Sequence, residues 1–192
     1  FERELSVLVA RDRAGNTATY PVVETRHVNN ICDTVISPAP IGLKDQKTAE
    51  TLATETVSLL DGAGVFAVEM FMTADGEMLV NEIAPRVHNS GHLTIEGNRT
   101  SQFEQHIRAV TGLPLGSTER QSPSAMVNIL YGPITKEGIK RALAVDGAHF
   151  HGYDKAPRPG SPRKIGHITV VAENAEIAEK QAIRARKELL NA

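Results

Sequence analysis

Residues 81–92 crowd chemically versatile side chains into a short run. Their sequence is NEIAPRVHNSGH, with a carboxylate, an arginine, two histidines, asparagine and serine. The apolar run at residues 78–80 that precedes it is typical of a strand, and Pro85 ends that strand because proline has no backbone N–H to donate. The polar groups are therefore expected on a loop beyond the strand, where scaffolds commonly present catalytic and binding residues.

Glu82 has a second carboxylate as its expected partner. Residues 64–72 are apolar and β-prone, and Asp75 and Gly76 separate them from the strand that carries Glu82. Asp-Gly between apolar runs is a strong signal for a hairpin. With these two residues at the centre of the turn, Glu69 and Glu82 are predicted to lie directly opposite each other.

Two facing carboxylates require an explanation, because cross-strand neighbours have Cβ atoms about 5 Å apart and like charges placed so destabilise a sheet. A divalent cation between Glu69 and Glu82 is one explanation, and Mg²⁺ suits one or two carboxylates with phosphates and water as its other ligands. The alternatives are that one glutamate is solvated at the sheet edge, or that the register slips by one residue and separates the pair.

Composition limits the kinds of partner. The 192 residues are 41% hydrophobic and 23% charged, and aromatic residues make up only 4% with no Trp, so a base-stacking surface for nucleic acid is not expected. The net charge of −2 and the absence of a Lys/Arg run likewise predict no polyanion or membrane-surface partner. A small-molecule partner fits better.

The chain context is also constrained. A single cysteine, Cys32, excludes an internal disulfide and favours a reducing compartment, and no run approaches a transmembrane or signal segment. We therefore expect a cytoplasmic protein, with an organelle left open. Because the first residue is Phe1 rather than Met, we expect the chain to be a piece of a longer protein.

The element pattern predicts an α+β fold with mainly antiparallel strands. A capping box at residues 101–104 marks the start of one helix, and a polar, Pro-containing run at residues 116–124 is the expected boundary between two units. Strands are predicted at residues 5–11, 17–24, 32–36, 64–72, 78–84, 125–131, 148–153 and 165–172, and helices at 44–61 (with Gly62 as its cap), 102–111, 135–144 and from Asn174 onward.

Other candidate sites are weaker. His88 and His92 have the four-residue spacing of a zinc pair, but such pairs normally lie on a helix, whereas this run follows a proline and contains Ser-Gly. Cys32 is flanked by apolar residues, which is typical of a small buried hydrophobe rather than a nucleophile.

Cations gather in a second polar run, residues 153–167. It contains Lys155, Arg158, Arg163 and Lys164 among prolines and glycines. Such a loop suits a phosphate or carboxylate ligand; the alternative is a solvated loop without one.

Taken together, these motifs resemble one family over nearly the whole chain. The sequence is similar to carboxyaminoimidazole ribonucleotide synthetase, the ATP-grasp enzyme that is also the ATP-grasp part of phosphoribosylaminoimidazole carboxylase. The run at residues 81–92 is the most specific match. The other matching segments are ELS at 4–6, YPVVE at 20–24 with His27, GVFAVE at 64–69, SQFE at 101–104 and YDK at 153–155.

The resemblance implies a fold and an activity. Residues 1–120 would form the C-terminal lobe of an ATP-grasp fold, and residues 121–192 a small sheet-containing C-terminal domain. The enzyme would use ATP and Mg²⁺ to convert bicarbonate to carboxyphosphate, and the amine of aminoimidazole ribonucleotide would then capture the carboxyl group in purine (IMP) biosynthesis. A homodimer and a fused mutase domain are left open.

The resemblance also implies roles for individual residues. Those roles are metal binding by Glu69 and Glu82; nucleotide binding by Glu4, His27, Asn81 and Glu82; catalysis near bicarbonate and the imidazole by Arg86, His88, Asn89 and Ser90; and substrate binding by Arg86, Lys155 and Arg163, the last two at the 5′-phosphate. Family members commonly run Arg-Pro-Gly directly into Arg-Lys, whereas Ser161 and Pro162 intervene here, so the phosphate role is open among Arg158, Arg163 and Lys164.

The family's N-terminal domain and the lobe with the nucleotide-binding lysine should precede Phe1, so we expect the isolated chain to be inactive. Three other functions remain as alternatives. They are another ATP-grasp purine ligase that uses formate or a related acid, a non-catalytic nucleotide-binding module, and a zinc hydrolase.

Overall fold

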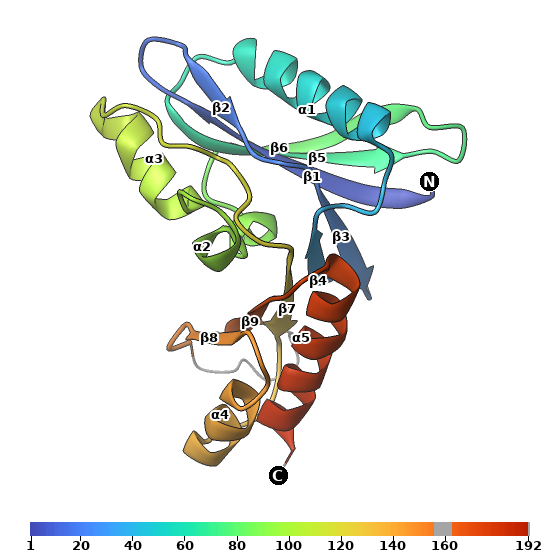
Figure 1. Cartoon of the computed structure of the whole chain (residues 1–192). Helices are drawn as coiled ribbons and strands as arrows, with labels where there is room; N and C mark the ends of the chain where they lie inside the picture. Colours follow the sequence, from blue (N-terminus) through green and yellow to red (C-terminus); the bar gives the residue numbers. More distant parts are fainter. Residues whose placement is uncertain (156–162, 192) are drawn as a thin grey trace.

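The computed structural model describes residues 1–155 and 163–191, and over these residues nine strands form one antiparallel sheet with helices packed against it (Figure 1). The strand order is β6-β5-β1-β3-β4-β7-β9-β8, and β2 pairs with β1 beside this path. The α+β prediction with mainly antiparallel neighbours is confirmed. The strands are β1 (Arg3–Arg11), β2 (Thr17–Thr19), β3 (Val23–Val28), β4 (Ile31–Ser37), β5 (Gly64–Met72), β6 (Met78–Ala84), β7 (Ser124–Ile129), β8 (Ala148–Gly152) and β9 (Gly166–Val171).

Helix α1 (Leu43–Ser58) covers one face of β1 and β5 (Figure 1). Its buried residues, Ala49, Ala53 and Val57, recur at the spacing of one helical face and pack into an apolar core with β1 and β5. The predicted end at residue 61 with a Gly62 cap is wrong, because the helix ends at Ser58 and Leu59 caps it in a right-handed conformation.

The strand predicted at residues 17–24 is two strands. β2 pairs with the end of β1, where Val9 faces Thr19, and β3 pairs with the beginning of β1, where Glu4 faces Thr25. Pro21 lies between them and cannot donate a backbone hydrogen bond, so the ladder is interrupted there. The break allows β3 to continue past β1 and pair with β4.

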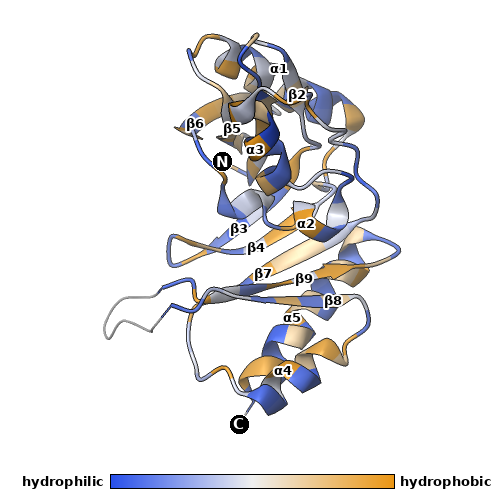
Figure 2. Cartoon of the chain, turned by 90° about the vertical axis from the view of Figure 1, so that its left-hand side faces the viewer, coloured by the Kyte–Doolittle hydropathy of each residue, from blue (hydrophilic) through white to orange (hydrophobic). Residues whose placement is uncertain are grey.

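The sheet continues through β4 and β7 into a second group of elements. β9 and β8 follow β7, and α4 (Lys136–Leu143) and α5 (Ala175–Leu190) pack against them. Figure 2 shows the apolar residues of β7 and β9 at this junction. The buried face of α5 consists of Ala178, Ala182, Ala185 and Leu189, as the sequence spacing predicted, and Asn174 caps the helix through the Ile177 N–H.

Three short helical segments lie at the end of the loop at residues 81–92 or follow it in the chain. They are the 3₁₀ turn η1 (Asn89–Gly91), α2 (Thr94–Gly97) and α3 (Gln102–Thr111). The capping signal at residues 101–104 is confirmed, since Ser101 accepts a hydrogen bond from the Glu104 N–H. None of the described helices combines the length and apolar character needed to cross a membrane.

A matched pair of glycine substitutions tests the packing of the β8–β9 end of the sheet. Gly147 and Gly76 both have positive φ, +70° and +85°, but a Cβ on Gly147 would lie 2.1 Å from the Val171 carbonyl oxygen, whereas one on Gly76 meets nothing within 4 Å. We expect Gly147→Ala to lower the free energy of unfolding by about 1–3 kcal/mol more than Gly76→Ala, because only the first adds a clash to the shared backbone strain. Urea unfolding of both variants measures the difference; equal losses would contradict it.

Candidate active site at the end of the β5–β6 hairpin

The two glutamates lie opposite each other, as the sequence predicted. β5 and β6 pair antiparallel, and Glu69 faces Glu82 in their register. On its other edge β5 pairs with β1 over the whole strand, and Ser6 is the partner of Glu69 there. Glu69 is therefore held in the interior of the sheet, one strand away from the edge strand that carries Glu82.

The route to this pairing differs from the prediction. Met72 faces Met78, so the turn encloses one residue more than a two-residue Asp-Gly turn would, and the Thr73 N–H donates to the Glu77 carbonyl oxygen. A β-bulge then makes Asn81 an extra residue on β6, which restores the register at the glutamates. The extra residue in the turn and the extra residue in the bulge offset each other, so Glu69 still faces Glu82.

Glu69 and Glu82 form a donor set that fits Mg²⁺. Burial raises the pKa of Glu69, and the negative charge of Glu82 raises it further, as expected for a carboxylate beside another carboxylate. Within the described part of the chain, no three His, Cys, Asp or Glu side chains come together as metal ligands, so the zinc alternative finds no ligand set there. Two carboxylates suffice for Mg²⁺, which takes its other ligands from phosphates and water.

A polar depression of about 60 Å³ lies beside Glu69. Its lining includes Glu4 from β1, His27 from β3 and Asn81 from the bulge of β6, and His27 Nδ1 is paired with a carboxylate oxygen of Glu4. The structure thus brings together three of the residues to which the resemblance assigns nucleotide binding. Asn81 reaches this site because it is the extra, unpaired residue of the bulge.

The loop after β6 is fixed by the buried side chain of Gln102. Its Oε1 accepts from the His88 N–H at 2.9 Å, and its Nε2 donates to the His88 carbonyl oxygen at 2.7 Å and contacts His92 Nδ1 at 2.9 Å. A Cβ on Gly91 would lie 2.3 Å from Leu8 and 2.7 Å from Gln102, so glycine is needed for this close approach. Sequence reasoning read residues 101–104 only as a helix start and missed this role.

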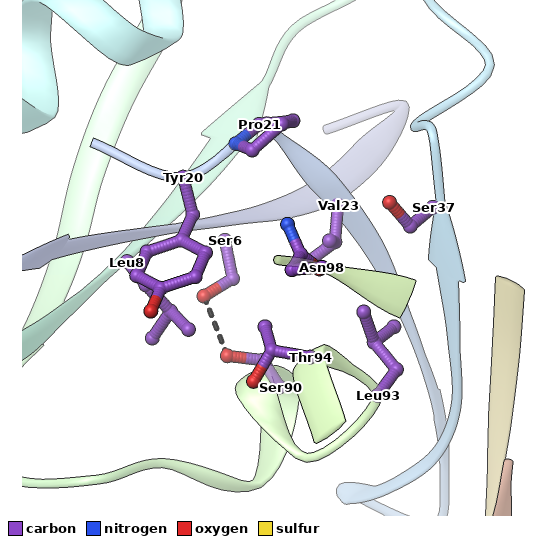
Figure 3. A pocket seen from close by; sticks show the side chains of 10 residues that line it. All are labelled: Ser6, Leu8, Tyr20, Pro21, Val23, Ser37, Ser90, Leu93, Thr94 and Asn98. Atoms are coloured by element: carbon purple, nitrogen blue, oxygen red, sulfur yellow. Dashed lines mark hydrogen bonds between the residues drawn. The ribbon is translucent and has the colours of Figure 1, made fainter. Parts of the chain in front are cut away.

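His88 faces Glu69 as a neutral ring. Burial, together with the nearby charges of Arg86 and Lys164, lowers the pKa of His88 to about 4, so its 3.5 Å contact with Glu69 is not an ion pair at neutral pH. His88 Nδ1 lies 2.9 Å from Ser90 Oγ. Figure 3 shows the next contact inward, Ser90 Oγ to Ser6 Oγ at 2.8 Å, which anchors the loop to β1.

Lys164 joins the same site from the C-terminal half of the chain. Its Nζ donates to Asn89 Oδ1 at 3.0 Å, and Asn89 exchanges two hydrogen bonds with the side chain of Asn128 on β7. Burial lowers the pKa of Lys164. Sequence reasoning considered Lys164 only for the 5′-phosphate and missed Asn128, a lone polar residue in an apolar strand.

Three histidine rings connect this loop to β8 and β9. The rings of His151 and His167 stack with centroids 4.4 Å apart, and His92 lies 5.1 Å from His167. Tyr153 Oη lies 2.6 Å from His167 Nδ1, and His151 Nε2 lies 2.7 Å from Glu96 Oε1. This cluster fixes the start of the cationic loop relative to α2 and to the loop at residues 81–92.

Of the predicted phosphate ligands, Lys155 lies beside this cluster. Lys155 is exposed, with Nζ 5.3 Å from the centre of the Tyr153 ring, and Arg163 directly precedes Lys164. Arg158 lies outside the described residues. Cys32 is buried and its pKa is raised to about 12 by burial, in keeping with the expected role as a small hydrophobe.

Two protein families match this chain. The ATP-grasp domain matches residues 1–103, and the phosphoribosylaminoimidazole carboxylase C-terminal domain matches residues 124–181. The first match covers more than half of the chain, so the chain belongs to the ATP-grasp family.

Individual relatives point to one kind of ATP-grasp enzyme. The chain is 51% identical to N5-carboxyaminoimidazole ribonucleotide synthetase from Thermotoga maritima, with a TM-score of 0.88 over 98% of this chain and 52% of that chain. It is 38% identical to the N5-carboxyaminoimidazole synthase of Aspergillus clavatus crystallised with ADP and 5-aminoimidazole ribonucleotide, with a TM-score of 0.89 over 98% of this chain and 51% of that chain. The family resemblance inferred from the sequence is thereby confirmed.

A third relative is an enzyme of the same kind, and this chain covers a smaller share of its length. Phosphoribosylaminoimidazole carboxylase from Ogataea methanolica is 46% identical over 189 residues, which are 94% of this chain and 34% of that protein. The chain therefore spans about half the length, or less, of these relatives.

The histidine cluster makes stability depend on pH. Burial, with neighbouring charges, lowers the pKa of His92 to about 4 and that of His167 to about 3. Below pH 6.5 the unfolded chain binds protons at these rings and the folded chain does not, so stability falls as the pH drops toward 4. At pH 5 the loss is about 2 kcal/mol per histidine.

Urea unfolding at pH 7 and pH 5 measures this effect. We expect the loss between the two pH values to be smaller by about 2 kcal/mol in His92→Gln and unchanged in His149→Gln, whose side chain is exposed. An identical pH response in His92→Gln and the unsubstituted chain would show that this ring does not carry the effect.

Proposed function

We propose that this chain forms part of the active site of an ATP-grasp ligase that carboxylates aminoimidazole ribonucleotide with bicarbonate, through carboxyphosphate, in purine biosynthesis. The observation that carries the proposal is the facing pair Glu69 and Glu82, with His88 of the following loop 3.5 Å from Glu69. The names of the similar proteins, and the ADP and ribonucleotide in the Aspergillus crystal structure, support the choice of substrates.

We also propose a division of the chain. Residues 1–120 would be the C-terminal ATP-grasp lobe, and residues 121–192 a small C-terminal domain. The two largest apolar clusters of the described residues support this division, one beneath α1 and one between β7, β9, α4 and α5. A smaller cluster, in which Met126 packs with Leu93 and Val35, spans the boundary. The two family matches, which end at residue 103 and begin at residue 124, flank the proposed boundary.

The acidic end of the site would handle ATP. Glu69 and Glu82 would hold Mg²⁺, which offsets negative charge on the transferring phosphoryl group. Glu4, His27 and Asn81 line the adjacent depression and would contact the nucleotide. Because the carboxylates repel each other without a cation, the pair is suited to bind Mg²⁺ together with the nucleotide rather than to persist alone.

The basic side would handle the acid and the amine. Arg86 and Lys164 bring positive charge to His88, which suits the anions bicarbonate and carboxyphosphate. When the ribonucleotide amine attacks the carboxyl carbon, phosphate leaves and the amine loses a proton. His88 is neutral at pH 7 and would accept that proton, while Asn89 and Ser90 would orient the reactants. Lys155 and Arg163 would bind the 5′-phosphate.

ADP release by the full reading frame that contains this chain tests the function. ATP and Mg²⁺ are supplied, with bicarbonate and aminoimidazole ribonucleotide added separately and together. We expect release to require the ribonucleotide and to fall about 100-fold or more in Glu82→Gln, because the transferring phosphoryl group loses stabilisation. Glu77→Gln, an exposed glutamate on the same hairpin, is the matched control and should retain activity.

The same substitution should stabilise the folded chain. Without ATP or Mg²⁺, Glu82→Gln removes the repulsion with Glu69 and should raise the free energy of unfolding by about 0.2–1 kcal/mol.

The ADP-release assay also separates the alternatives. ADP release that does not depend on the ribonucleotide would indicate another ATP-grasp ligase, and no ADP release from a folded protein would indicate a non-catalytic nucleotide-binding module.

A further inference from the structure

Asn128 is buried on β7, with 1% of its surface exposed, and every hydrogen-bonding atom of its carboxamide is used. Its Nδ2 donates to the Cys32 carbonyl oxygen at 2.8 Å and to Asn89 Oδ1 at 2.7 Å, and its Oδ1 accepts from Asn89 Nδ2 at 2.9 Å. The two carboxamides thus form a closed pair between β7 and the loop at residues 81–92, far apart in the sequence.

The backbone carbonyl of Cys32 decides which way this pair points. A carbonyl oxygen only accepts hydrogen bonds, so the Nδ2 of Asn128 must face Cys32, and its Oδ1 must face Asn89. Asn89 must then direct its Nδ2 toward Asn128. Its Oδ1 is left with one lone pair for Asn128 and a second that faces Lys164 Nζ at 3.0 Å.

The reverse orientation would be unfavourable at both ends. A flipped Asn128 would oppose its Oδ1 to the Cys32 carbonyl oxygen, and a flipped Asn89 would oppose its N–H groups to the ammonium group of Lys164. Buried polar groups without a partner are costly, so the observed orientation is strongly preferred.

We propose that Asn128 is a positioning residue of the active site: through Asn89, it fixes an acceptor toward Lys164 and so sets where the ammonium group of Lys164 lies. The inference rests on the proposed function for its catalytic consequence, since Lys164 would meet the anionic reactants beside His88. The side-chain hydrogen bonds of Asn128 go to Cys32 and Asn89, and not to His88 or the facing glutamates.

The backbone around Asn128 is anchored independently of the carboxamide pair. Arg186 on α5 donates to the Asn128 carbonyl oxygen at 3.1 Å and binds both carboxylate oxygens of Asp33 on β4, at 2.6 and 3.1 Å. Loss of the Asn128 side chain should therefore leave β7 in place. This separates a positioning effect from collapse of the strand.

A double-mutant cycle on the full reading frame tests the connection through Asn89. We expect Asn128→Leu to lower kcat for ribonucleotide-dependent ADP release about tenfold with KM for ATP unchanged, because Lys164 is misplaced while the nucleotide depression is intact. Asn128→Leu should add nothing in an Asn89→Leu background. Effects that multiply in the double variant would overturn the proposal.

The matched control is Asn98→Leu. Asn98 is also a buried asparagine, and its Nδ2 donates to the Thr118 carbonyl oxygen at 2.9 Å rather than to Asn89. It should leave kcat unchanged. A fall in kcat as large as that of Asn128→Leu would show that any buried asparagine gives the effect and would overturn the proposal.

A second readout needs no turnover. Acetylation of Lys164 by acetic anhydride is followed by peptide mass spectrometry, relative to the exposed Lys180. In Asn128→Leu the ratio of Lys164 to Lys180 acetylation should rise about threefold, because the amine of Lys164 loses its fixed acceptor. An unchanged ratio would overturn the proposal.

If Asn128→Leu does not fold, Asn128→Ala replaces it, since the smaller side chain leaves space for water to reach the Cys32 carbonyl. Unsubstituted protein without ribonucleotide-dependent release would refute the proposed function, while the acetylation ratio would still test the positioning.

Discussion

Repulsion between Glu69 and Glu82 is the constraint around which the site is organised. Two carboxylates face each other across neighbouring strands, and one of them lies inside the sheet, where burial already raises its pKa. A flexible loop would let such a pair separate. Here β5 is held by a ladder to β1 along its whole length, and this pairing keeps the backbone of Glu69 in place despite the repulsion. The two charges are thereby kept on facing residues of neighbouring strands.

The other polar groups are arranged around Glu69 by separate parts of the chain. His88 approaches it from the loop after β6, Glu4 and His27 lie in the adjacent depression, and Lys164 comes from the segment before β9. Each has a polar partner of its own: Ser90 for His88, each other for Glu4 and His27, and Asn89 for Lys164. The side-chain carboxamides of Gln102 and Asn128 fix the position of the loop after β6, as strand pairing fixes the positions of the glutamates. Each carboxamide has one orientation that satisfies its hydrogen bonds.

Local patterns predicted what depends on local physics. The β5–β6 hairpin, the Ser101 cap and the alanine face of α5 follow from turn chemistry, capping and helical spacing, and all are present in the structure. The motif at residues 81–92 was recognisable because its polar residues are consecutive. These signals were sufficient for the fold class and for most of the residues proposed for the site.

What the sequence concealed depends on contacts between distant segments. The bulge at Asn81 has no marker of its own, and only strand pairing reveals it. Asn128 is a single polar residue in an apolar strand. Gln102 lies inside the capping motif at residues 101–104, but that motif gives no sign of its hydrogen bonds to His88. The break at Pro21 was readable from proline chemistry, but its consequence, that β3 leaves β1 to pair with β4, depends on the whole sheet.

The β4–β7 pairing has a mechanical consequence. It joins the β1–β5 side of the sheet to the β7–β9 side by a ladder in which Thr34 to Ser37 face Val127 to Ser124, and Arg186 on α5 binds Asp33 across the same pairing. A hinge at this place would have to break several backbone hydrogen bonds and a bidentate ion pair at once. The strands that carry the two glutamates and the strand that carries Asn128 therefore belong to one continuous hydrogen-bonded sheet.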